Sequence, residues 1–254
     1  MSNAKQRYRL TTKSGRRKIM FFDIEAAGVQ GLKADRSFIP CFSYKWEGDK
    51  KPTLLSILDY PGKNCQDDTR LLKKIYLVMR EAHALVAHFG EYFDRPFVDA
   101  RFAQAGLPAI PNMRLTDTCL IARRRLCISS NRLANLAEFL KCDTKKMEKG
   151  RGWPDWWMGA LRGHRESIRK MGVYCMQDVQ CLEEVYMAMR HLIPIRDLPI
   201  NSAIGSSVWT CPACGGRRKN YRGIQFSEMK AYHRIQCQEC GFWTRERRAI
   251  DFKG

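Results

Sequence analysis

The pattern of apolar and polar residues in the first third of the chain predicts three strands and one helix. An apolar run rich in β-forming residues over 18–24 predicts a buried strand. Further strands are expected over 38–46 and 52–60, with Glu47-Gly48-Asp49 turning between them. The segment 67–82 places its apolar residues on one face at helical spacing, which predicts an amphipathic helix.

Strands and helices then alternate. We expect a strand over 83–88, a helix over 91–105 and a short strand over 113–116. Asp117 or Thr118 is expected to cap the helix that follows. Three strands followed by alternating helices and strands predict an α/β fold with a mixed sheet.

Toward the C-terminus, the pattern of apolar and polar residues defines helices and strands less sharply. Ser130 and Asn131 are expected to cap a helix that runs to 140, and a Trp-rich stretch after 150 is expected to be irregular. Two helices, over 165–171 and 172–191, complete the α/β part. We therefore expect four parts: a basic N-terminal arm (1–17), an α/β domain (18–193), a linker (194–207) and a cysteine-rich module (208–254).

The composition is that of a soluble globular protein. Of the 254 residues, 44% are hydrophobic and 28% are charged, and the mean hydropathy is −0.44. No apolar run approaches the roughly 20 residues of a membrane-spanning helix. The run Ile19–Phe22 ends at Asp23 and is too short for the core of a signal peptide. We therefore expect a cytoplasmic protein without a membrane partner.

The net charge of +19 is unevenly distributed. Residues 1–18 hold seven basic residues and no acidic one, and residues 211–254 hold ten basic and four acidic residues. The two ends of the chain are strongly basic, whereas positive and negative charges nearly balance in the residues between them. Such a distribution is typical of proteins that bind a polyanion, most often nucleic acid. A basic surface that serves only solubility is the alternative.

Four of the eleven cysteines form a metal-binding pattern. Cys211 and Cys214 make one Cys-x-x-Cys pair, and Cys237 and Cys240 make a second pair, with 22 residues between the two pairs. A glycine follows each pair and permits a tight turn that aims amides at the sulfurs. This spacing predicts one structural Zn²⁺ ion, and a redox pair or two disulfides are the alternatives.

Acidic residues occur where burial should exclude them. Asp23 and Glu25 lie two apart on an apolar strand, so they share a face and repel each other unless a cation binds them. Asp94 follows the fourth strand, where an acid at a helix N-terminus is the alternative. Tyr174 and Asp178 share one face of a helix, where a surface Tyr–Asp pair is the alternative.

Taken in order, these residues resemble a known set of motifs. The chain resembles the DEDD (DnaQ-like) 3′–5′ exonucleases, which have a ribonuclease H-like fold. The three exonuclease motifs of that family are matched in order by Phe22-Asp23-Ile24-Glu25, Phe93-Asp94 and Tyr174-x-x-x-Asp178. Tyr four positions before the last Asp resembles the tyrosine subgroup. Between the second and third motifs, two short segments resemble the YprB-type branch, which includes phage-encoded members with a C-terminal zinc ribbon: Asp117-Thr118 and Ser130-Asn131-Arg132-Leu133.

The resemblance covers about residues 18–250 and implies a fold, an activity and a site. The fold is a ribonuclease H-like mixed β-sheet flanked by helices, followed by a zinc ribbon. Asp23, Glu25 and Asp178 would ligate one Mg²⁺ or Mn²⁺ ion, and Asp23 would bridge to a second ion near Asp94. Tyr174 would orient the attacking water.

The resemblance also implies the activity, a metal-dependent 3′–5′ exonuclease acting on single-stranded ends, with DNA favoured over RNA. In the family, Asn is usual at the position of Phe89 and Thr at that of Ala26, and both residues help to hold the 3′ end. The alternatives are a 3′–5′ exoribonuclease of the same fold and a non-catalytic zinc-ribbon adaptor in a replication or repair assembly.

Basic and aromatic residues outside the acidic motifs are candidates for contacts with nucleic acid, because bases stack on aromatic rings and phosphates bind cations. A tryptophan that covers the core, or a solvated basic face, is the alternative. The candidates are Arg123, Arg124, Lys145, Lys146, Trp153, Arg217, Arg218, Lys219 and Arg245.

Overall fold

The computed structural model describes residues 11–12, 15–16, 18–29, 32–144 and 153–251, with the side chains of 11–17 and of 153–154 left out. The chain forms two compact units, of which one is Lys18–Ala188 and the other contains Met189–Gly254. Among the described residues, no helix is both long and apolar enough to span a membrane.

The first unit is built on a five-stranded mixed sheet with the order β5-β4-β3-β6-β7. The central strand β3 pairs in parallel with β6, which pairs in parallel with β7, whereas β4 and β5 run antiparallel. The strands are β3 (Ile19–Gly28), β4 (Ser37–Trp46), β5 (Thr53–Ser56), β6 (Ala84–Ala87) and β7 (Arg114–Asp117).

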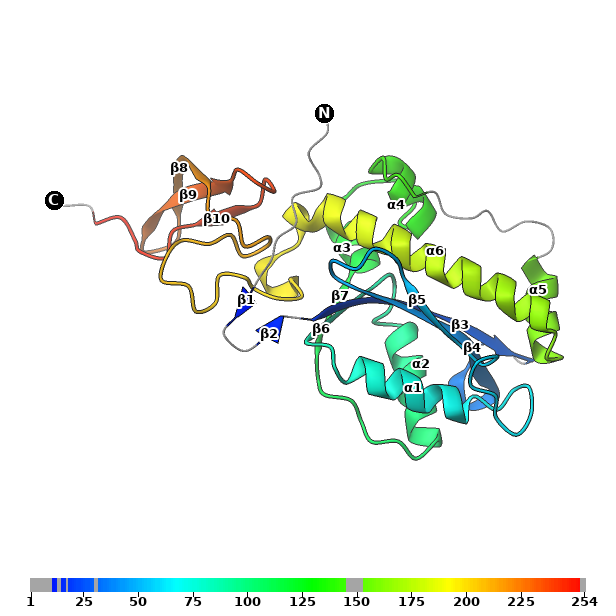
Figure 1. Cartoon of the computed structure of the whole chain (residues 1–254). Coiled ribbons are helices and arrows are strands. Elements are labelled where there is room, and N and C mark those ends of the chain that lie inside the picture. The colour runs from blue at the N-terminus through cyan, green and yellow to red at the C-terminus, as the bar shows by residue number, and fades with distance from the viewer. Residues whose placement is uncertain (1–10, 13–14, 17, 30–31, 145–152, 252–254) are drawn as a thin grey trace. The chain divides into compact units, whose positions relative to one another are not determined.

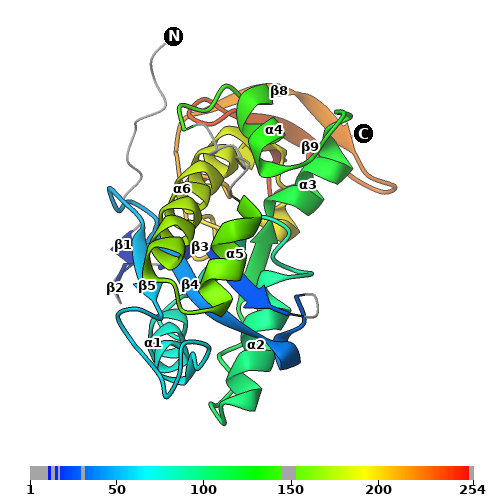
Figure 2. The same ribbon diagram turned by 90° about the vertical axis from the view of Figure 1, so that its right-hand side faces the viewer.

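Helices cover both faces of this sheet. Figures 1 and 2 show α1 and α2 on one face and α4, α5 and α6 on the other. The expected mixed α/β fold is thereby confirmed. The helices are α1 (Thr69–Met79), α2 (Asp94–Gln104), α3 (Thr118–Arg125), α4 (Leu133–Phe139), α5 (Trp153–Leu161) and α6 (Arg165–Met189), with short 3₁₀ turns at Ala34–Arg36, Arg190–Leu192 and Ile195–Asp197.

The strand β3 is buried on both faces of the sheet, which explains its nearly continuous apolar sequence. The ring of Phe21 packs edge-on against Tyr186 of α6, with ring centroids 5.4 Å apart. The ring of Phe22 points to the opposite face and stacks on Phe42 of β4, at 5.9 Å. A charged side chain on this strand is therefore surrounded by apolar residues.

One long helix, α6, replaces the two helices expected on either side of 171. Gly172 lies inside it and faces Leu54, where an added Cβ would come within 2.6 Å of Leu54 Cδ2. Glycine therefore permits a close approach to β5 instead of ending the helix. The buried Lys45 of β4 donates to Gln180 and forms an ion pair with Glu183, which fixes α6 over the sheet.

Two other local predictions are wrong. The Trp-rich stretch forms the helix α5, with Pro154 in its first turn, where proline is compatible with a helix. Helix α4 has Arg132 as its N-cap and lacks a side-chain cap. The hydroxyl of Ser130 accepts a hydrogen bond from the Arg132 amide at 3.4 Å, so it closes a local turn before the helix instead.

The second unit contains a three-stranded antiparallel sheet with the order β10-β9-β8. The segment predicted as a linker packs within this unit: Arg247 donates to the carbonyl oxygens of Ala203 and Ser206, and the Ser202 amide donates to Pro212. The domain boundaries themselves stay predictions. The strands are β8 (Lys219–Phe226), β9 (Ala231–Cys237), β10 (Trp243–Arg245) and a separate pair, β1 (Thr11–Thr12) with β2 (Gly15–Arg16).

Candidate active site and cysteine cluster

Two acidic residues project from β3 within the apolar core. Glu25 is 8% exposed, and Asp23 is partly buried. The strand pairing is interrupted between Glu25 and Ala27, and Trp157 of α5 donates its indole N–H to the Ala26 carbonyl at 2.9 Å. The bulge and this bond fix the end of β3 next to the two carboxylates.

The third carboxylate reaches β3 from the start of α2. Asp94 is buried, and its Oδ1 accepts a hydrogen bond from the Ile24 amide at 3.2 Å. Because Ile24 lies between Asp23 and Glu25, this bond brings Asp94 to the same part of the strand.

The fourth carboxylate, Asp178, is buried on α6 together with Tyr174 and Cys175. The Cys175 thiol donates to the Asp23 carbonyl oxygen at 3.4 Å and to its carboxylate at 3.5 Å. Potential ligand atoms of Asp23, Glu25 and Cys175 lie within 4.8 Å of one another. Through these contacts α6 meets β3, although Cys175 and Asp23 are 152 residues apart in sequence.

The protonation of these groups reflects their crowding. Burial, aided by the carboxylates of Asp117 and Asp178, raises the pKa of the Asp94 carboxyl to about 7. Burial also raises the pKa of the Cys175 thiol well above its usual value, and nearby Asp23 and Glu25 raise it further. Asp178 contributes to both shifts, so its carboxylate interacts electrostatically with Asp94 and with Cys175. A divalent cation would relieve the repulsion between the carboxylates.

Sequence reasoning placed Asp23, Glu25, Asp94, Tyr174 and Asp178 in the site. The structure groups Asp23 and Glu25 with Cys175, and it brings Asp94 to the Ile24 amide between them. Asp178 lies on α6 three residues after Cys175, and the buried Tyr174 lies one helical turn before Asp178.

Cys175, which contacts Asp23, is not distinguished in the sequence from a core residue, because its neighbours on α6 are apolar. Its position beside Tyr174 was the only available signal that it lies at the site.

A second missed residue, Asp117, holds the loop that carries Asp94. Its carboxylate accepts hydrogen bonds from the amides of Cys119 and Leu120 and thus caps α3, as one of the two expected caps. The same carboxylate accepts from the amides of Phe89 and Glu91, each at 3.0 Å. Asp117 therefore positions the loop between β6 and α2.

This loop presents an aromatic surface. Phe89 has a φ of 65°, a left-handed conformation that is uncommon for a bulky residue. Its ring is 39% exposed and tilts against Tyr92 at 5.5 Å, and the Arg123 guanidinium lies 5.3 Å from its centroid. Of the predicted basic contacts, Arg123 is thus placed beside the loop that leads to Asp94.

The raised pKa of Asp94 gives a prediction for stability. Between pH 4 and pH 7 the folded chain binds more protons than the unfolded chain, so this group lowers stability as the pH rises. We expect Asp94→Asn to raise the free energy of unfolding at pH 8 by roughly 2–4 kcal/mol and by much less at pH 4. Urea titrations without added Mg²⁺ at the two pH values measure the difference.

Asp68 provides the matched control, because it is equally buried but paired. Its carboxylate binds the Arg101 guanidinium and accepts from the Ile39 amide at 2.8 Å. Asp68→Asn breaks a buried ion pair and should destabilise the protein at both pH values. Equal destabilisation by Asp94→Asn at pH 8 would contradict the account of Asp94.

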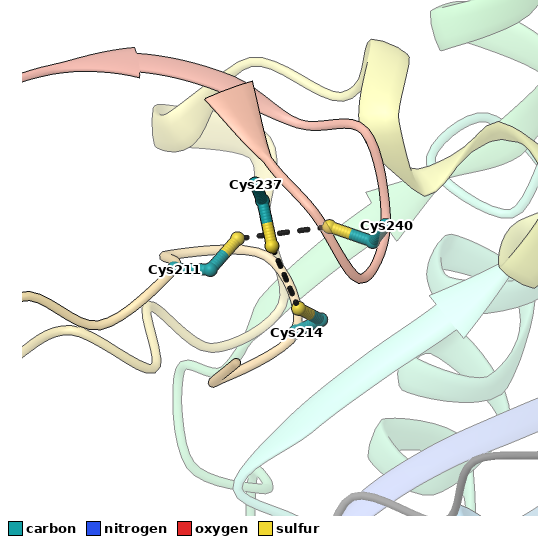
Figure 3. A group of neighbouring side chains, drawn as sticks. All are labelled: Cys211, Cys214, Cys237 and Cys240. Carbon is teal, nitrogen blue, oxygen red and sulfur yellow. Dashed lines mark hydrogen bonds between the residues drawn. The ribbon is translucent and has the colours of Figure 1, made fainter. Parts of the chain in front are cut away.

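The four cysteines of the second unit converge on one point (Figure 3). The sulfurs of Cys211 and Cys240 are 3.6 Å apart, and those of Cys214 and Cys237 are 3.7 Å apart. A tetrahedral ion with bonds of about 2.3 Å to sulfur requires sulfurs about 3.8 Å apart. None of the cysteines in the described part of the chain forms a disulfide. The cluster therefore fits a zinc ribbon.

In each turn of the cluster, a backbone amide donates a hydrogen bond to a cysteine sulfur. The Gly216 amide donates to Cys214 Sγ at 3.3 Å, and the Glu239 amide donates to Cys237 Sγ at 3.4 Å. Gly215 and Gly241 adopt φ angles of 77° and 75°, which a glycine adopts without strain. Such bonds stabilise thiolates, the form that binds metal.

The remaining predicted contacts to nucleic acid are scattered. Arg217 and Arg218 flank Glu239, and Lys219 forms an ion pair with Glu246 at 3.2 Å. Lys145 and Lys146 lie outside the described residues, and so does the side chain of Trp153. The other two tryptophans of α5 pack against the core. Arg124 and Arg245 are exposed.

The mixed sheet and its buried acidic site define an RNase H-like α/β protein. A family model described as the RNase_H superfamily matches residues 20–190, well over half of the chain. The chain belongs to the RNase H superfamily. This membership supports a nuclease-type activity in general, on nucleic acid and with the divalent metals that RNase H-like nucleases use.

Structural comparison supports the fold. The chain is similar to the family B DNA polymerase from the hyperthermophilic archaeon Pyrobaculum calidifontis, with a TM-score of 0.55 and 13% sequence identity. The similarity covers 87% of this chain and 32% of the polymerase chain, so this chain spans about a third of the polymerase's length. At this identity the likeness concerns the fold alone. No curated protein matches the chain.

Proposed function

We propose that this protein is a metal-dependent 3′–5′ exonuclease of the DEDD type, in its tyrosine subgroup, which hydrolyses phosphodiester bonds from single-stranded 3′ ends. DNA is the favoured substrate. The observation that carries the proposal is the approach of Asp94, and of α6 next to Asp178, to Asp23 and Glu25 of β3.

The carboxylates fit a pair of Mg²⁺ or Mn²⁺ ions, because these hard cations prefer oxygen ligands. Asp23, Glu25 and Asp178 would hold one ion, with Asp23 shared by a second ion near Asp94. When bound, such ions would supply an activated water and would stabilise the leaving 3′ oxygen. The fit rests on the burial and mutual repulsion of Asp94 and Asp178, which an added positive charge would offset.

The chain's own residues have three tasks in this proposal. The bond from the Ile24 amide holds Asp94 against β3, so that its carboxylate is fixed before substrate binds. The Tyr174 hydroxyl would donate or accept the hydrogen bond that orients the attacking water. Asp117 keeps the preceding loop in place through its two amide contacts. In the second unit, one Zn²⁺ at the four cysteines would be structural.

We predict that Phe89 contributes to binding of the 3′ end of the substrate. Its exposed ring would stack on the terminal base, in place of the polar contact that Asn makes in relatives. Phe89→Gly, which removes the ring without adding a polar contact, should raise the KM for a single strand about tenfold and change kcat little. Since glycine adopts a positive φ without strain, the protein should stay folded.

Phe89→Tyr, which keeps the ring, should keep the parent KM. Steady-state rates with an oligonucleotide of fixed sequence measure both variants. An unchanged KM in Phe89→Gly would exclude a stacking role.

Incubation of 5′-labelled DNA and RNA oligonucleotides with Mg²⁺ or Mn²⁺ tests the function. We expect a ladder that shortens from the 3′ end, with DNA degraded faster. Faster loss of RNA would instead identify the exoribonuclease alternative. Binding without cleavage under both metals would contradict the proposal and favour the adaptor.

A further inference from the structure

The two faces of the ribbon sheet differ in burial. Residues directly opposite each other in an antiparallel pair point to the same face. On one face, Ile235 is paired with Tyr221 on β8 and with Thr244 on β10. Ile235, Cys237 and Ala231 are buried, so this face carries the small core of the module.

The opposite face, here called the open face, is polar, aromatic and without acidic residues. The register places Gln236 opposite Asn220 and Trp243, and Arg234 opposite Arg245. The three strands contain neither Asp nor Glu. The open face consists of Asn220, Gln225, Tyr232, Arg234, Gln236, Trp243 and Arg245.

The open face has a depression with an aromatic wall. Trp243 is 47% exposed and lines the depression with Gln225 and Arg234 of the same face. The adjacent Thr244, which the register assigns to the core-side face, also borders it. Beside it, the Arg245 guanidinium stacks on Tyr232, 3.6 Å from the ring centroid. Exposed aromatic rings flanked by cations and amides are the groups that recognise the flat faces of bases and the phosphates between them.

Two of the four acidic residues of the ribbon, Glu246 and Glu239, form contacts away from the open face, and the other two, Glu228 and Asp251, lie outside its three strands. Glu246 accepts a hydrogen bond from the Tyr221 hydroxyl and pairs with Lys219, and both of these residues belong to the core-side face. Glu239 lies in the second cysteine turn, where it accepts from the Arg217 amide and pairs with Arg218. The cations of the open face therefore keep their attraction for an anion.

We propose that the open face binds a single strand of nucleic acid, with a base stacked on Trp243 and phosphates held by Arg234 and Arg245. The positive charge and the lack of carboxylates select a polyanion over an acidic or apolar partner. This inference takes from the proposed function only that the ligand is a nucleic acid. The site would hold a strand independently of the carboxylates that cleave it.

Trp243 can be tested against an exposed aromatic residue of the other face. In a full-length Asp178→Asn background, which prevents cleavage, Trp243→Leu should weaken binding of a labelled oligothymidylate about tenfold. Trp243→Phe should stay within about threefold of the parent, because it keeps a stacking ring. Phe226 is 73% exposed, points to the core-side face and provides the control Phe226→Leu, which should bind like the parent.

The contribution of Arg234 and Arg245 can be tested by measuring how the affinity for a single strand depends on salt concentration. Each phosphate contact to a single strand contributes about 0.7 to the slope of log affinity against log salt concentration. The double variant Arg234→Gln with Arg245→Gln should therefore lower this slope by about 1.4. One zinc per chain in each variant would show that the ribbon is intact.

Equal affinities of Trp243→Leu and Phe226→Leu, with zinc retained, would overturn the proposal. So would the absence of binding by the parent to both oligothymidylate and oligouridylate. The stronger of the two ligands identifies DNA or RNA as the occupant. Because binding is measured without cleavage, a failed exonuclease proposal would appear separately, as a parent chain that binds the strand but does not shorten it.

Discussion

Asp178→Asn is expected to reduce hydrolysis by about a thousandfold or more while the protein stays folded. The substitution keeps the size of the side chain but removes a negative charge from the region shared with Asp23 and Asp94. Fewer ligand charges weaken the hold on divalent ions and the stabilisation of the transition state. Single-turnover cleavage of a labelled oligonucleotide at saturating Mg²⁺ measures the loss.

Another acidic residue of the same helix provides the control. Glu166 is exposed in the first turn of α6 and pairs with Arg169 at 3.6 Å. Glu166→Gln removes the same charge from the same helix and should leave the cleavage rate within about twofold, because exposed ion pairs contribute little. Full activity in Asp178→Asn would refute the assignment of the site.

Cys237→Ser is expected to remove the zinc and unfold the ribbon. Structural zinc sites in small modules contribute about 10–16 kcal/mol of apparent binding energy, and these modules have little other core. Zinc measured by atomic absorption should fall from one ion per chain to none. The sheet signal of the ribbon should be lost, as seen by protection of backbone amides over 219–245.

Cys65→Ser is the control for this variant, because Cys65 is an exposed cysteine outside the cluster. It should retain zinc and amide protection. Since the four carboxylates lie within Lys18–Ala188, Cys237→Ser should still hydrolyse short oligonucleotides at a measurable rate. Retention of one tightly bound zinc in Cys237→Ser would contradict a four-cysteine site.

The sheet could be predicted from the sequence because each strand carries its own local signal. The apolar run of β3 and the alternation of strands and helices after it were sufficient for the fold class. Asp23 and Glu25 were detectable because acids are conspicuous within an apolar strand. Asp94 and Asp178 have no such local signal, and only their resemblance to ordered motifs connected them to β3.

The features that could not be predicted depend on contacts between distant segments. Gly172 would end an isolated helix, but its approach to Leu54 keeps it within α6. Asp117 was visible as a helix cap, whereas its bonds to the amides of the 88–93 loop require the fold. Cys175 has the sequence context of a core residue, and its contact with Asp23 arises from packing across 152 residues.

Manganese binding shows whether the carboxylates of β3, α2 and α6 form one site for two divalent ions. The zinc-loaded chain can be titrated with Mn²⁺ and followed by electron paramagnetic resonance, in parallel with Asp178→Asn. We expect two Mn²⁺ ions per parent chain, with the spin coupling of ions about 4 Å apart, and loss of that coupling in the variant. A parent chain that binds no Mn²⁺, or identical spectra for the two proteins, would exclude such a site.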